Sequence, residues 1–176
     1  MANRYSPSEV LGLQFGENEI GWKGVSSVEL GDIMGRRWAT DGLLFHRSNP
    51  ACGDLVNKTQ ALLFKFNITD APNIILGLEL RVVAQRNGRA TDEQIQLSYQ
   101  DQAIGTNNFN YITDEEGRIS LHNDTTYGGP TNTWGTTLTQ EIVQDPSFGV
   151  ILKFQGHPYY PHNSNMFLDS VSLTVF

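Results

Sequence analysis

The sequence predicts an all-β fold, a jelly-roll-like antiparallel β-sandwich with an irregular N-terminal arm. Two runs near the C-terminus carry most of the evidence, because their apolar residues alternate with the period of two that a half-buried strand requires. The first run covers residues 148–154 and the second covers residues 167–175. Turn signals recur at short intervals elsewhere, and helix signals are few. This combination favours a sandwich over a fold of alternating strands and helices.

Length and glycine spacing divide the chain into two parts. Its 176 residues are enough for one ordinary domain with a sizeable core. In residues 1–37, glycines interrupt every apolar patch before it reaches the length of a stable element. We expect this part to be an N-terminal arm that docks on a neighbouring subunit, or an irregular edge segment of the sandwich. Residues 38–176 are expected to form the β-sandwich domain.

Strand signals follow one another after the arm. Short apolar runs occupy residues 43–46 and 61–68, and a longer alternating run covers residues 74–85. In the longer run, the apolar side chains of Leu76, Leu78, Leu80 and Val82 are expected to share one face. An Asn-Gly turn then precedes another alternating run at residues 94–99, a pattern that predicts a β-hairpin.

Two short stretches have helical character. Residues 137–144 are followed by Asp145-Pro146, a sequence that ends a helix. Residues 8–11 are the second candidate. Neither is long enough to change the predicted fold class.

The amino-acid composition limits the kinds of partner that this protein is expected to bind. Nineteen acidic and twelve basic residues give a net charge of −7, which disfavours binding to nucleic acid or to an anionic membrane surface. No apolar run reaches the length of a membrane span, and residues 1–7 lead into no secretion signal. The single cysteine allows no intramolecular disulfide. We expect synthesis in a cytoplasm and a protein or a sugar as the partner.

The acidic residues that are candidates for catalysis lie in hydrophilic stretches. The candidates are the pair Asp92 and Glu93, the three acidic residues at 114–116, and Asp54. The sequence around them predicts exposed turns, where nothing would shift a carboxyl pKa. The sequence also lacks the nucleophile, zinc-protease and phosphate-loop motifs. We therefore expect a protein that is not an enzyme and that needs no cofactor.

A loop between the two C-terminal strands is the first candidate contact site. It carries His157, Tyr159, Tyr160 and His162 among prolines and small polar residues. The two histidines have no helix or strand geometry to bring them to one metal ion, so an interfacial or solvated loop is favoured over a metal site.

Residues 123–135 form a second candidate site. Tyr127 and Trp134 stand among short hydrogen-bonding side chains, a mixture that suits stacking on a sugar or a rigid protein contact. The competing interpretation places Trp134 in the core, beneath a Gly-Gly-Pro turn.

Several motifs along the chain together resemble those of β-sandwich structural proteins from tailed bacteriophage particles. They are Asp41-Gly42, Asn87-Gly88, Tyr127-Gly128-Gly129-Pro130, Trp134-Gly135, Leu138-Thr139, the run 145–150 and the run 168–175. The likeness covers about residues 38 to 176. It implies a non-catalytic virion component on the head, collar or tail that contacts other virion proteins, usually as a homo-oligomer or in many copies.

The last strand also looks like that of jelly-roll carbohydrate-binding modules. In those modules an acidic residue near the position of Asp169 can help to hold a structural calcium ion, but the other ligands of such a site cannot be assigned in this chain. The alternative function is accordingly a carbohydrate-binding module of a tail fibre that attaches to a host glycan. Tyr127, Trp134, Tyr159 and Tyr160 would be its stacking residues.

Overall fold

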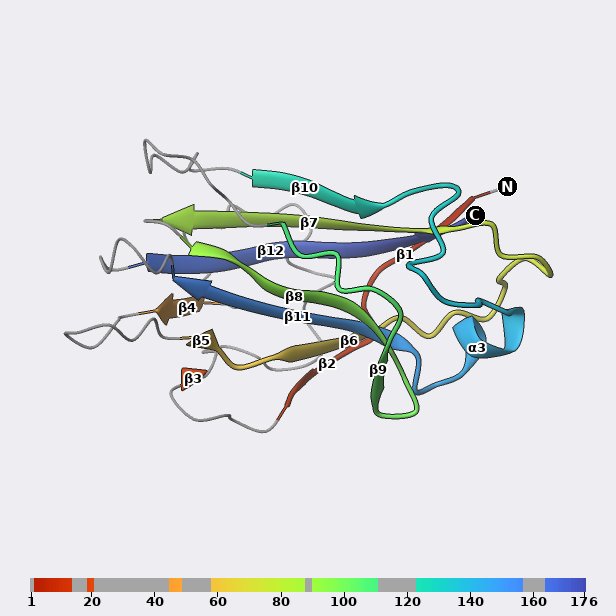
Figure 1. The fold of residues 1–176 in the computed structure, drawn as a ribbon, viewed down its shortest axis with the longest axis horizontal. Coiled ribbons are helices and arrows are strands. Elements are labelled where there is room, and N and C mark those ends of the chain that lie inside the picture. Colours follow the sequence, from red (N-terminus) through yellow and green to blue (C-terminus); the bar gives the residue numbers. More distant parts are fainter. Residues whose placement is uncertain are drawn as a thin grey trace.

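The computed structural model describes residues 2–13, 19–20, 45–48, 58–87, 90–110, 123–156 and 164–176. These residues form two β-sheets that pack face to face, with one short helix at one end (Figure 1). The described strand pairs are antiparallel except for the pairing of β3 with β5. The predicted all-β sandwich is therefore confirmed.

The first sheet has the order β1-β12-β7-β10, and β4 also pairs with β12. Its long central strands, β7 and β12, lie side by side for most of their length (Figure 1). The strands of this sheet are β1 (Asn3–Tyr5), β4 (Phe45–Ser48), β7 (Leu78–Asn87), β10 (Asn123–Gly128) and β12 (Ser164–Val175).

The second sheet is centred on β11, which pairs with β5, β6 and β8. At its margins, β2 pairs with β6, β3 with β5, and β9 with β8. The strands of this sheet are β2 (Glu9–Gly12), β3 (Glu19–Ile20), β5 (Lys58–Thr59), β6 (Leu62–Lys65), β8 (Ala90–Tyr99), β9 (Gln102–Ile104) and β11 (Gly149–Gly156).

The hydrophobic core lies between the sheets and is built by alternation along the strands. The apolar faces of β11 and β12 meet there, as their sequence pattern predicts. Phe148, just before β11, is also buried. The fully buried side chains of these two strands are Val150, Leu152, Phe154, Val171, Leu173 and Val175.

A β-bulge in β12 interrupts the predicted alternation. Leu168 pairs with Ala84 and Ser170 pairs with Val83, so Asp169 is an extra residue in the strand. Because the bulge shifts the period by one residue, Leu168 is buried on the same side as Val171. The expectation of one unbroken alternation through residues 167–175 is wrong at this point.

The predicted hairpin between residues 74–85 and 94–99 is also wrong. Strand β7 pairs with β12 and β10, whereas β8 belongs to the other sheet and pairs with β11 and β9. The chain therefore crosses from one sheet to the other between these strands. Leu78, Leu80 and Val82 are buried as predicted, but the strand starts only at Leu78, and Leu76 is exposed.

The helix prediction near residue 140 is confirmed by α3 (Gln140–Gln144). The Thr139 side chain accepts a hydrogen bond from the Ile142 backbone N–H at 3.3 Å, and the helix stops at Asp145. The second predicted helix, at residues 8–11, is wrong, because β2 occupies this segment and pairs with β6. One turn of helix forms few hydrogen bonds, so strand pairing prevails there.

The described part of the N-terminal segment contributes to both sheets. Strand β1 pairs with β12 in the first sheet, and β2 pairs with β6 in the second. Val10 of β2 is buried in the core. Among the described residues, no helix is long and apolar enough to cross a bilayer.

Replacing Val10 with alanine should lower the free energy of unfolding by about 1–3 kcal/mol, because it leaves a cavity in the core. Arg4→Ala, at an exposed position of β1, should change it by less than about 0.5 kcal/mol. Urea denaturation of the purified chain measures both. Equal stability of the Val10 variant and the unchanged chain would mean that β2 adds nothing to the core.

Candidate functional site

A second β-bulge creates the most unusual polar site in the described structure. Lys153 of β11 pairs with Gln94, and the next residue, Phe154, pairs with Asp92. Glu93 is thus an extra residue in β8, and Asp92 joins Ile95 among the buried residues of this strand. The run of four polar residues at 91–94 is the sequence signal of this bulge, because it breaks the period of two.

Asp92 lies between the two sheets with 1% of its surface exposed. Its Oδ2 atom accepts a hydrogen bond from the Tyr127 hydroxyl at 2.6 Å and one from the Asn110 backbone N–H at 3.0 Å. Tyr127 belongs to β10, so the first bond connects the two sheets. A buried carboxyl group is costly without such donors. The expectation that Asp92 sits in an exposed turn is therefore wrong.

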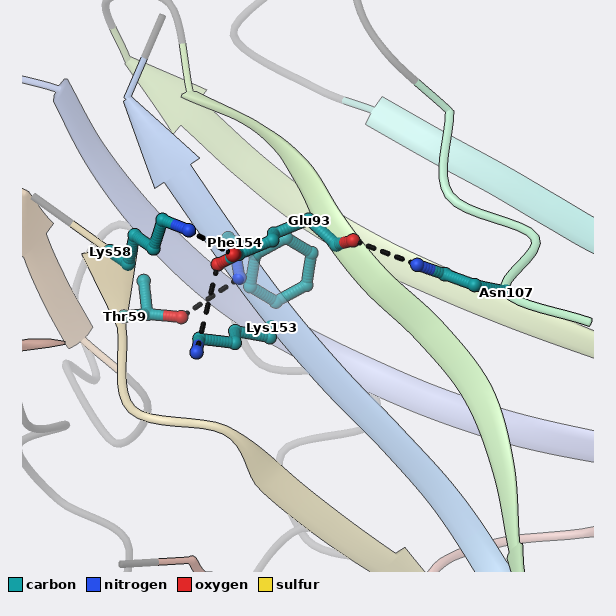
Figure 2. Close-up of polar contacts among 6 residues, drawn as sticks. All are labelled: Lys58, Thr59, Glu93, Asn107, Lys153 and Phe154. Atoms are coloured by element: carbon teal, nitrogen blue, oxygen red, sulfur yellow. Dashed lines mark hydrogen bonds and ion pairs between the residues drawn. The ribbon is translucent and has the colours of Figure 1, made fainter. Parts of the chain in front are cut away.

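Glu93 of β8 points toward two lysines, Lys153 of the neighbouring strand β11 and Lys58 of β5 (Figure 2). Lys58 Nζ lies 2.5 Å from Glu93 Oε1, and Lys153 Nζ lies 3.8 Å from Glu93 Oε2. Beside them, the Thr59 hydroxyl accepts a hydrogen bond from the Phe154 backbone N–H at 2.8 Å. The group joins β5, β8 and β11, and the local sequence gives no sign that these residues meet.

Asn107 protects part of the outer edge of β8. Its Oδ1 atom accepts from the backbone N–H groups of Ile95 (2.8 Å) and Phe109 (3.2 Å), and its Nδ2 atom donates to the Glu93 backbone carbonyl at 3.0 Å (Figure 2). The side-chain amide thus takes the place of a peptide group from a further strand. Pairing an edge in this way removes a template for unwanted strand association.

Trp134 is buried in the core, as one of its two interpretations predicts. None of its surface is exposed, and its indole N–H donates to the Leu78 carbonyl at 2.9 Å. Gly128 (φ +78°) lies against the ring, and a Cβ atom there would come within 2.5 Å of the indole nitrogen. Tyr127 is only 5% exposed. Neither aromatic ring therefore offers a face for stacking on a ligand.

The other candidate contact residues, His157, Tyr159, Tyr160 and His162, lie outside the described residues. On either side of them, the described residues end at Gly156, which pairs with Ala90, and resume at Ser164, which pairs with Ser48. Within the described ranges, no three His, Cys, Asp or Glu side chains are grouped closely enough to hold a metal ion.

The chemistry of the described site is that of a structural junction. Its carboxylates receive donors or ion pairs from other strands, and its amide side chain pairs with backbone groups. Sequence reasoning singled out Asp92, Glu93 and Tyr127 but did not connect them. It missed Lys58, Thr59, Asn107 and Lys153, which only the strand order brings together.

Comparison with known proteins gives no family. No family model matches the sequence, and no curated protein matches it. A solved structure described under the words "Prominent members of the human gut microbiota express endo-acting O-glycanases to initiate mucin breakdown" resembles 98% of this chain and 97% of that chain. The sequence identity is 14% and the TM-score is 0.41. A likeness of this size carries no functional argument.

Tyr127→Phe should lower the free energy of unfolding by about 1–3 kcal/mol, because the buried Asp92 carboxyl loses its donor from the other sheet. Tyr99→Phe is the matched control, since the Tyr99 hydroxyl makes an exposed contact with Gln100 and its loss should cost less than about 0.5 kcal/mol. Chemical denaturation measures both variants. Equal losses for the two would show that the bond between the sheets has no special weight.

Asn107→Asp should destabilise the edge of β8, because a carboxylate cannot donate to the Glu93 carbonyl. We expect faster hydrogen exchange at the backbone amides of Ile95 and Phe109, by about tenfold or more if the local cost reaches 1.4 kcal/mol. Asn73→Asp, at an exposed position away from β8, is the control. Unchanged exchange at Ile95 in the Asn107 variant would contradict the proposed edge protection.

Proposed function

We propose that this chain is a non-catalytic structural component of a bacteriophage particle, a head decoration, collar or tail-associated protein that makes contacts between subunits. Other virion proteins and further copies of the chain would be its partners, and the assembled virion its location. The sequence resemblance over residues 38–176 motivates the phage context, and the confirmed β-sandwich fits it.

The proposal that the protein is non-catalytic is supported by the contacts that the carboxylates of the polar site make. Of the carboxylates that the sequence offers for acid and base chemistry, Asp92 and Glu93 are both engaged in joining strands, whereas residues 54 and 114–116 lie outside the described residues. Asp92 has almost no exposed surface through which a substrate would reach it. Residues committed to strand connections in this way suit a rigid building block.

The glycan-binding alternative loses support from two of its four stacking residues. Stacking on a sugar needs an exposed aromatic face, and Trp134 and Tyr127 are buried. Tyr159 and Tyr160 lie outside the described residues. No described feature favours this alternative, so the structural role is retained.

Particles purified from the phage that encodes this chain should contain it at a fixed number of copies per particle, because a structural component occupies defined sites. Quantitative mass spectrometry of gradient-purified particles measures this number. A tag on the chain should also be located at regular positions by electron microscopy. Absence of the chain from washed particles, with the protein found free in the lysate, would refute the proposal.

A further inference from the structure

One end of the sandwich combines exposed apolar side chains with negative charge. We call it the acidic pole and define it as residues 66–77, 99–106 and 129–148, which contain α3 and β9 and lie together at one end of the molecule (Figure 1). Ile74 and Leu76 are 74% and 59% exposed, the two highest values among the large hydrophobic residues described. Exposed apolar residues held side by side commonly mark an interaction site.

Two glutamines of α3 hold the segment that leads to Ile74. Gln140 Nε2 donates to the Ala71 carbonyl at 2.6 Å, and Gln144 Nε2 donates to the Thr69 carbonyl at 2.9 Å. These bonds join parts of the chain that are 69 and 75 residues apart. The segment is therefore fixed by the helix before any partner arrives.

Backbone contacts fix the two exposed residues themselves. Ile74 forms an isolated β-bridge with Thr139, and the Leu76 N–H donates to the Phe176 carbonyl at 2.7 Å. Ile75, between them, is buried and anchors the segment in the core. A contact residue that is already ordered loses little conformational entropy on binding, so its apolar area contributes more to affinity.

All the charged side chains of the acidic pole are negative. Its three segments contain Asp70, Asp101, Glu141 and Asp145 and no lysine or arginine. Hydrogen bonds from the Ser147 hydroxyl and backbone N–H lower the pKa of Asp145, so this carboxylate is charged near neutral pH. Even with the bordering bases Arg4 and Lys65, four acidic and two basic groups leave a net charge of −2.

We propose that the acidic pole, centred on Ile74 and Leu76, docks onto another protein whose contact surface is apolar in the middle and bordered by lysine or arginine. Charge complementarity selects this occupant. A second copy docked pole to pole would place like charges opposite each other, and a phosphate backbone would be repelled. This inference rests on the proposed structural role and names the surface and the partner chemistry that the role would use.

The test uses a defined probe, a labelled amphipathic helical peptide with leucines on one face and lysines on the other. A second peptide with glutamate in place of lysine controls for charge. Fluorescence anisotropy should show tighter binding of the lysine peptide to the purified chain, and amide shifts in NMR spectra should fall on residues 70–77 and 139–145. Binding should weaken as salt is added, because exposed charges are screened.

Three variants locate the contact. I74S/L76S should weaken binding by about tenfold or more, because it removes the apolar centre. D101N/E141Q changes two exposed carboxylates and should reduce the salt dependence. F109S removes an exposed apolar side chain outside the acidic pole and should bind like the unchanged chain. Thermal unfolding of each variant verifies that the fold is retained.

Several results would overturn the inference. Unchanged peptide binding in I74S/L76S would do so, as would an equal loss in F109S. Dimers that appear in sedimentation experiments and vanish in I74S/L76S would assign the surface to a second copy instead. Because the peptide assay contains no particles, failure there together with normal incorporation of I74S/L76S into particles would refute the docking surface alone and leave the structural role standing.

Discussion

The hydrogen bond from the Tyr127 hydroxyl to the Asp92 carboxyl is the contact around which the buried polar site is arranged. It joins β10 of one sheet to β8 of the other and supplies a donor to a carboxyl group that would be costly to bury alone. The bulge at Glu93 makes the bond available, because it turns Asp92 into the interior and leaves Glu93 to Lys58 and Lys153. One extra residue in β8 thus allows both the hydrogen bond between the sheets and the ion pairs of Glu93.

The sequence predicted those parts of the fold that local patterns control. Alternation located the strands around Val150 and Leu173, and the stop signal Asp145-Pro146 located the end of α3. The partners of a strand depend on residues far along the chain, which explains why an Asn-Gly turn was misleading between β7 and β8. The polar run 91–94 marked part of the site in the sequence, but the contact of Asp92 with Tyr127 could be found only from the sheet order.

The burial of Trp134 and Tyr127 decides between a binding role and a core role for these aromatic residues. Trp134 and Tyr127 stood out because they combine large rings with polar neighbours, a combination that occurs both in binding sites and in cores with specific hydrogen bonds. Their indole and hydroxyl groups both find internal partners, and so they belong to the second category. The exposed apolar groups, Ile74 and Leu76, lie instead in a segment whose sequence reads as an ordinary strand.

The position of β12 has a consequence for biosynthesis. This strand pairs with β1, β4 and β7, and all three precede it in the chain. Asn3, for example, is paired with Val175. Since a polypeptide leaves the ribosome from its N-terminus, the first sheet lacks its central strand until residues 164–175 have emerged. Until then the earlier strands of this sheet have unpaired edges, which favour association with other chains.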